Sequence, residues 1–249
     1  MYLKKTTKYG NRIDTRKYHT FKCPGKDCSR SERKKPTKEK IAEANERRAI
    51  KKMMMLIMEN FDSGDWHLTL TYASEERPDA AGAKKKLRNL FTKLRRAYRA
   101  AGLELKYFVV PEFENKNIHH HVVITDIPGI QKLLRKFWTW GGIHLTPLYD
   151  NKDFKGLVNY LVKETKNTFR KEGNPFKQRW SCSRNLRKPE VHRTKVNANS
   201  WREEPTVPPS LAKQGYVLDK TSIVVGVDTM GYPFQEYTMI RYEKKERRR

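Results

Sequence analysis

Cysteines, acidic residues and long apolar runs are scarce in this chain of 249 residues. Three cysteines are too few for a disulfide framework and are typical of a reducing compartment. Cys23 and Cys28 follow His19, but no second ligand pair accompanies them, so zinc is not expected. The longest apolar run, Met53 to Met58, is too short to span a bilayer, and no signal segment follows the basic amino terminus. We therefore expect a cytoplasmic protein that is neither secreted nor bound to a membrane.

Acidic residues are outnumbered by basic ones, 28 against 54, which gives a formal net charge of +26. Because the excess is spread along the whole chain, it favours nucleic acid over a local membrane patch as the partner. A generic basic surface, as in a ribosomal protein without chemistry, is the alternative. No G-x-x-x-x-G-K-[ST] sequence occurs, so the chain carries no P-loop, and any unwinding of DNA is expected to need a host helicase.

The middle of the chain alternates between strand and helix patterns. The hydrophobic periods predict strands at 66–72, 105–112, 118–125 and 142–147, and helices at 80–101, 130–138 and 154–165. This order indicates an α+β fold, a ferredoxin-like (RRM-like) antiparallel sheet with helices packed on one face and the other face free for a site.

The flanking segments are basic. We expect 1–60 to form an arm and a helix, irregular over 1–35 and helical from Pro36 to Asn60. The main domain would be 61–166, followed by a basic extension, 167–249, with a hairpin at 216–242. Phosphate contacts are expected from Lys155, Arg170, Lys177, Arg179, Arg184 and Arg187. Nearby aromatics, Phe176, Trp180 and Trp201, either stack on bases or pin the loops to the domain.

Three consecutive histidines open the strand at 118–125. Side chains alternate along a strand, so His119 and His121 point to one face and His120 to the other. If the two strands pair as a hairpin, Glu112 lies close to the outer histidines. Two imidazoles and a carboxylate suit a divalent cation that keeps positions open for substrate. Histidines that are merely surface or hydrogen-bonded core residues are the alternative.

The last helix places Tyr160, Lys163 and Glu164 at spacings of three and four, and therefore on one face. A tyrosine among apolar positions is usually a core residue, but this one is followed by a cation and a carboxylate. Tyrosine is suited to attack on a phosphodiester when the bond energy must be conserved, because a later hydroxyl can reverse the link. Lys163 would orient the phosphate or lower the pKa of Tyr160, and Glu164 would either activate water or form a structural salt bridge.

Together these motifs resemble the replication-initiator (Rep) proteins of the HUH endonuclease superfamily, over roughly residues 66–164. The matching segments are WHLTLTY, the histidine pair preceded by VVPEFE, and NYLVKE. The resemblance implies Mg²⁺ or Mn²⁺ dependence, nicking of a single-stranded or hairpin origin DNA in rolling-circle replication, and a covalent 5′-phosphotyrosine intermediate. It also implies a bacterial, nucleoid-associated protein that works with a host helicase and the replication machinery.

Two other functions remain open at this point. A single-tyrosine transposase shares the order of motifs, whereas relaxases usually place the tyrosine before the histidines. A non-catalytic nucleic-acid-binding protein on the same fold would need exposed aromatics on its central strands, and the corresponding positions here carry His and Thr.

Overall fold

The computed structural model describes residues 1–20, 37–114, 117–148, 154–170, 178–228 and 231–242. The chain divides into two compact units. The central unit is Lys52–Arg187, and the flanking unit combines Met1–Lys51 with Lys188–Arg249. The helix α1 (Lys38–Asn60) runs from one unit into the other. The central unit thus extends beyond the range 61–166 expected from the sequence at both ends.

The central unit contains a five-stranded antiparallel sheet, which confirms the α+β class and the strands expected between residues 66 and 147. Neighbouring strands follow the order β6 (Ile143–Pro147), β3 (Trp66–Leu70), β5 (Asn117–Ile124), β4 (Tyr107–Glu114) and β7 (Ser181–Cys182). β7 lies in the segment where only loops were expected, so that expectation is wrong at these two residues. The predicted hairpin of β4 and β5 pairs Glu112 with His119.

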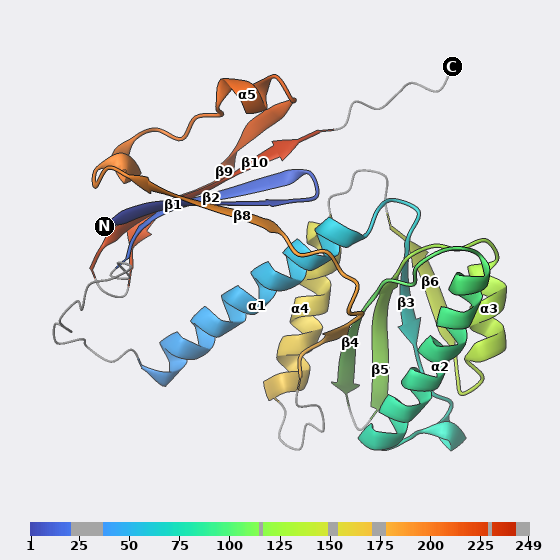
Figure 1. Ribbon diagram of the computed structural model, residues 1–249. Coiled ribbons are helices and arrows are strands. Elements are labelled where there is room, and N and C mark those ends of the chain that lie inside the picture. Colours follow the sequence, from blue (N-terminus) through green and yellow to red (C-terminus); the bar gives the residue numbers. More distant parts are fainter. Residues whose placement is uncertain (21–36, 115–116, 149–153, 171–177, 229–230, 243–249) are drawn as a thin grey trace, which may run out of the picture. The chain divides into compact units, whose positions relative to one another are not determined.

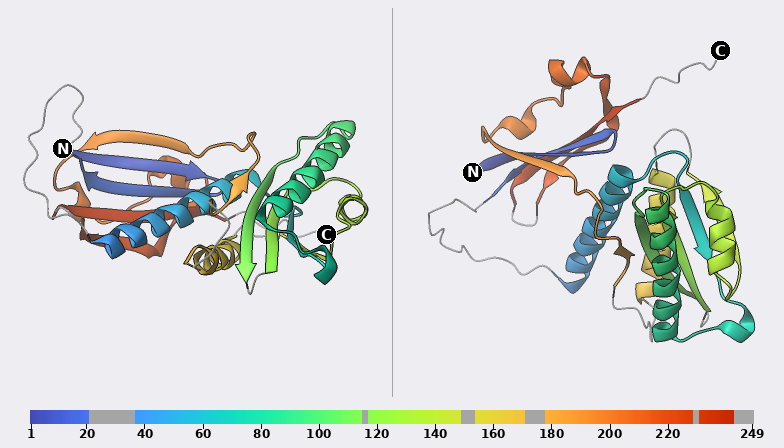
Figure 2. Two further views of the ribbon diagram at one scale, coloured as in Figure 1. Left: turned by 90° about the horizontal axis from the view of Figure 1, so that it is seen from below. Right: turned by 45° about the vertical axis from the view of Figure 1, so that its right-hand side comes forward.

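One face of this sheet is covered by α2 (Ala80–Ala100) and α3 (Ile130–Phe137) (Figures 1 and 2). Both helices match the predicted ranges, and Gly102 follows α2 with a positive φ of 69°. The apolar residues of the three layers form one buried cluster, which includes Leu68, Leu70, Leu90, Leu94, Val109, Val122, Ile124 and Leu134. Burial of these side chains fixes which face of β5 is left for polar residues.

The helix α4 (Lys155–Arg170) lies on the opposite face of the sheet, against β4 (Figures 1 and 2). Its inner side chains, Val158 and Leu161, are fully buried. The prediction of helices on only one face is therefore wrong. The period of a helix shows which of its own residues are apolar, but it does not show which side of a sheet they cover.

A tight connection joins α3 to β6 at Gly141 and Gly142. The backbone of Thr71 lies so close to Gly141 that an added Cβ would overlap the carbonyl oxygen of Thr71. The Trp138 Nε1–H donates to the same oxygen at 3.1 Å. Only glycine fits this close approach, which holds β6 beside β3.

The flanking unit contains a second five-stranded antiparallel sheet, built from both ends of the chain (Figure 1). Its order is β8 (Glu190–Val196), β1 (Tyr2–Tyr9), β2 (Arg12–His19), β10 (Pro233–Arg241) and β9 (Tyr216–Val227). The hairpin of β9 and β10 was predicted. The irregular arm over 1–35 is a wrong prediction for residues 2–19, which form β1 and β2, while 21–36 lie outside the described residues.

One face of the flanking sheet packs on the segment after β8, which includes the short helices η2 (Ser200–Arg202) and α5 (Pro209–Ala212). Ile13, Tyr237 and Met239 are buried there. A further short helix, η1 (Ser74–Glu76), belongs to the central unit. None of the helices in the described ranges is long and apolar enough to cross a bilayer.

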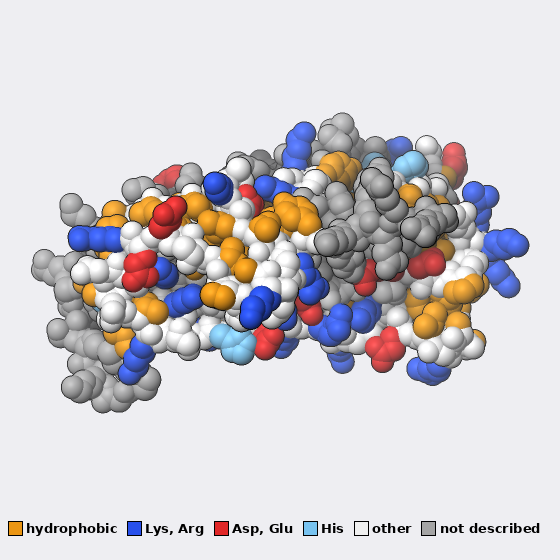
Figure 3. Space-filling view, turned by 90° about the horizontal axis from the view of Figure 1, so that it is seen from above, with side chains coloured by type: hydrophobic (Ala, Val, Ile, Leu, Met, Phe, Trp, Pro, Cys, Tyr) orange, Lys and Arg blue, Asp and Glu red, His pale blue; other side chains and the backbone are white. Residues whose placement is uncertain are grey.

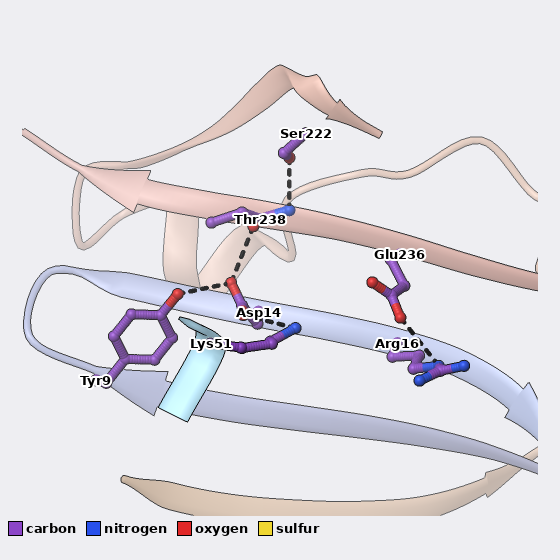
Figure 4. A network of polar contacts seen from close by, with 7 residues as sticks. All are labelled: Tyr9, Asp14, Arg16, Lys51, Ser222, Glu236 and Thr238. Carbon is purple, nitrogen blue, oxygen red and sulfur yellow. Dashed lines mark hydrogen bonds and ion pairs between the residues drawn. The ribbon is translucent and has the colours of Figure 1, made fainter. Parts of the chain in front are cut away.

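The other face of the flanking sheet carries a polar network centred on Asp14 (Figure 4). Its carboxylate accepts hydrogen bonds from the hydroxyls of Tyr9, at 3.0 Å, and Thr238, at 2.9 Å. The ammonium of Lys51 lies 2.9 Å from the second carboxylate oxygen. A buried carboxylate with three such partners is stabilised in its charged form.

Candidate active site

The face of the central sheet beneath α4 gathers the polar side chains of four strands. Strand register places Thr69 opposite both His121 and His144, and Glu112 opposite His119. Residues directly opposite in a ladder share a face, so these side chains lie on the same side of the sheet. The sequence pattern predicted this for the β4–β5 pair, and it is confirmed there.

Glu112 contacts both outer histidines. Its Oε2 lies 2.8 Å from Nε2 of His121 and 3.8 Å from Nδ1 of His119. His121 is buried, with the hydroxyl of Thr69 3.4 Å from its Nδ1. With Glu112 ionised, Nε2–H of His121 donates to the carboxylate, and the hydroxyl of Thr69 donates to Nδ1.

His120 lies on the other face, as the alternation predicted. Its Nε2 is 3.0 Å from the hydroxyl of Tyr72, and its ring packs edge-on against Trp138. Burial lowers the pKa of His120 to about 3, with smaller effects from His121 and His119. The ring is therefore neutral and serves the helix-covered core, so it takes no part in the polar cluster.

Tyr160 reaches the cluster from α4. Its ring packs edge-on against that of His121, with centroids 5.2 Å apart and an interplanar angle of 89°. The residue is nevertheless 44% exposed. A tyrosine that contacts a buried imidazole and remains accessible from solvent is placed to meet a bound substrate.

The other two residues predicted on α4 are less defined. Lys163 lies one turn beyond Tyr160 and is exposed. The backbone of Glu164 belongs to α4, but its side chain lies outside the described residues. The structure therefore assigns Lys163 to solvent near the tyrosine and gives no contact for Glu164.

His67 belongs to this face and was missed by the reading of the sequence. Its ring stacks on His121 with centroids 5.5 Å apart and meets Tyr160 edge-on at 6.3 Å. Burial, followed by the neighbouring His121 and His144, lowers the pKa of His67 to about 4, so the imidazole is neutral at pH 7. The signal was present, because His67 and Thr69 occupy the polar positions of an alternating strand.

The predicted phosphate contacts are scattered. Lys155 and Arg184 are exposed and Arg179 is half-buried. The side chain of Arg170 and the whole of Lys177 lie outside the described residues. The guanidinium of Arg187 donates to the carbonyl of Glu59 at 3.3 Å, so it helps to hold the end of α1.

Trp180 stacks on Phe108, with centroids 5.9 Å apart, and so pins its loop to the sheet. Of the two interpretations of this tryptophan, packing is the one observed. Phe176 lies outside the described residues.

The donor set has the chemistry of a divalent-cation site. Two imidazole nitrogens approach the same carboxylate oxygen, and imidazole with carboxylate suits Mn²⁺ and related ions. Among the described residues, no three His, Cys, Asp or Glu side chains already form a metal-binding group. The direct contact between His121 and Glu112 explains this, since the nitrogen that would be the ligand carries the hydrogen-bond proton.

Comparison with protein families finds one match. Residues 65–169 match the family model of the replication-associated protein ORF2. The matched range lies within the central unit and contains Glu112, His119, His121 and Tyr160. No curated protein matches the chain. The family match supports a replication initiator of the Rep type, and with it DNA as a partner.

Proposed function

We propose that the protein is a replication initiator of the HUH type, which nicks single-stranded DNA at an origin and rejoins the ends during rolling-circle replication. The observation that carries this proposal is the contact of Tyr160 with His121, which in turn is bonded to Glu112. The family match over 65–169 supports the replication role independently of this geometry.

In the proposed reaction, the hydroxyl oxygen of Tyr160 attacks the scissile phosphorus. A phosphorus–oxygen bond forms to the tyrosine while the bond to the 3′ oxygen breaks, and the proton lost by the tyrosine ends on the released 3′-hydroxyl. Rejoining is the reverse, in which a 3′-hydroxyl attacks the phosphotyrosine and releases Tyr160. No cleavage energy is lost to water in either direction.

Glu112, His119 and His121 would hold Mg²⁺ or Mn²⁺ on the floor of the site. Such a cation supplies charge stabilisation for the phosphate oxygens as negative charge develops on them. The chain's own residues do the positioning: α4 holds Tyr160 over the strand of His121, and Thr69 fixes the ring of His121 from the other side.

Lys163 and Glu164 enter the proposal as auxiliary residues. Lys163, exposed one helical turn from Tyr160, would orient the phosphate or favour the ionised tyrosine. Glu164 would activate water when the covalent complex is released. Glu164→Gln should then leave nicking intact and slow release, whereas unchanged release rules out this role. Unwinding is assigned to a host helicase, because the sequence has no P-loop.

The test uses pools of labelled single-stranded DNA with Mn²⁺, resolved on a denaturing gel. The wild type should form a covalent protein–DNA adduct that EDTA prevents, and Tyr160→Phe should form none. Tyr242→Phe is the matched control, because Tyr242 is 69% exposed and far from α4 in sequence. An adduct that persists in Tyr160→Phe would assign the nucleophile elsewhere. If no protein forms an adduct yet all bind DNA, the site is one of binding alone.

A further inference from the structure

The flanking unit contains a cavity of about 720 Å³. It lies where β1, β2, β8 and β10 meet, because strand register places Tyr2 opposite both His19 and Val196, and the cavity also reaches Pro233 at the start of β10. The segment from Asn197 to Arg202 forms another part of its wall. Its volume is in the range of small-molecule sites and is large enough for one or two nucleotides.

Aromatic rings line this cavity. His19 and Tyr232 stack at 3.9 Å with an interplanar angle of 12°, and Tyr2 meets His19 edge-on at 5.4 Å. Trp201 is half-buried in the wall, with the guanidinium of Arg202 5.0 Å from its ring. Flat rings that are already stacked provide a surface on which a nucleobase stacks without regard to its identity.

The polar groups of the lining are cations and amides. Lys195 and Arg202 are exposed, and Asn197 and Asn199 stand between them in the chain. No Asp or Glu is among the described residues that line the cavity. The nearest acid in the wall's support is Asp228, whose carboxylate accepts the backbone N–H of Tyr232 at 3.0 Å. The lining thus presents positive charge and amide hydrogen bonds beside rings.

We propose that this cavity binds single-stranded DNA, with one or two bases against the aromatic lining and the backbone phosphates beside Lys195 and Arg202. Charge alone does not single out this place. On the face drawn in Figure 3, Lys and Arg side chains are dispersed, with Asp and Glu between them. The combination of a cavity, stacked rings and cations without an acid in the lining is what identifies the ligand as a nucleic-acid strand with unpaired bases.

This site lies outside the range 65–169 of the family match and shares no residue with the proposed nicking site. Its test therefore uses full-length protein carrying Tyr160→Phe, so that the readout is binding without cleavage. Failure of the nicking proposal leaves this binding intact, and failure of the binding leaves adduct formation by the wild type unaffected as evidence.

Trp201 provides the signal, since it is the one tryptophan of the flanking unit among the five in the sequence. Titration with a 12-nucleotide oligothymidylate should quench tryptophan fluorescence, and the added change Trp201→Phe should remove a clear part of that quenching. Equal quenching in both proteins would overturn the proposal.

Charge is tested by a matched pair of double variants. Lys195→Gln with Arg202→Gln should weaken oligothymidylate binding about tenfold. Lys213→Gln with Lys220→Gln removes the same charge from exposed positions of the flanking unit outside the cavity, and should weaken it less than twofold. Thermal melting of both variants checks the fold. Equal weakening by the two pairs, or equal competition by a duplex of the same length, would show binding by charge only and overturn the proposal.

Discussion

The two sheets of this protein have the same size and the same antiparallel pairing, but they treat a buried acid differently. In the flanking sheet, Asp14 is held by two hydroxyls and the ammonium of Lys51 (Figure 4). In the central sheet, Glu112 faces two imidazoles. A lysine keeps its charge and makes a permanent partner, whereas an imidazole can exchange a proton for another ligand. The chemistry of the neighbours, and not burial, separates a structural acid from a reactive one.

The largest effect should come from Glu112→Gln, which keeps the shape of the side chain and removes its charge. We expect adduct formation with Mn²⁺ to fall at least about 100-fold, because the carboxylate ligand of the proposed cation is lost. Glu104→Gln is the control, since Glu104 is exposed and accepts a hydrogen bond from Asn185 in the same unit. A loss below threefold for Glu112→Gln would place this acid with Asp14 as a structural residue.

Asp14→Ala should act on stability instead. The buried hydroxyl of Tyr9 loses its acceptor and Lys51 loses its ion-pair partner, which should lower the free energy of unfolding by about 3 kcal/mol. Urea unfolding followed by the fluorescence of Trp201, in the same unit, measures this. Lys51→Gln should cost less than about 1 kcal/mol, because that side chain is 46% exposed. Equal effects would mean that the ion pair, and not the hydroxyls, holds Asp14.

Tyr72→Phe should have a smaller effect, on the helix-covered face of the central sheet. It leaves Nε2 of the buried His120 without its hydroxyl partner, which should cost about 1–2 kcal/mol in urea unfolding. Tyr107→Phe is the comparison, because the hydroxyl of Tyr107 bonds only to Arg95, at 3.3 Å and at an exposed position, among the contacts described for it. Unchanged stability of Tyr72→Phe would show that His120 is satisfied by other means.

Glu236→Gln should have the smallest effect. Its ion pair with Arg16, at 3.0 Å, is partly exposed on both sides, so its removal should cost less than about 0.5–1 kcal/mol. A double-mutant cycle with Arg16→Gln measures the coupling. A coupling as large as the effect of Asp14→Ala would show that the whole flanking network acts as one unit.

Local patterns carried most of the central unit. Alternation placed His119 and His121 on one face and His120 on the other, and helical spacing located α2, α3 and α4. Neither pattern contains the third dimension, so the side of the sheet that α4 covers, and with it the contact of Tyr160 with His121, required the structure. His67 was overlooked because its strand was used only to identify a core position, although the same alternation marks its polar face.

The flanking unit was much less accessible to the same reasoning. β1 and β2 are rich in Lys, Arg and Thr, a composition that resembles a solvated arm when it is seen alone. They become strands because β8 and β10 pair with them, and those partners come from the far end of the chain. Pairing across such a distance leaves no periodic signal in either segment.

That pairing also sets an order of events during synthesis. The central unit is complete once Arg187 has left the ribosome, and its sheet can close while the rest is still being made. β2 must wait for β10, and until then the hairpin of β1 and β2 exposes two unpaired edges. A folded central unit shortens the effective loop between them and lowers the entropy cost of the late closure. The nascent chain therefore acquires its proposed chemistry before it acquires its second sheet.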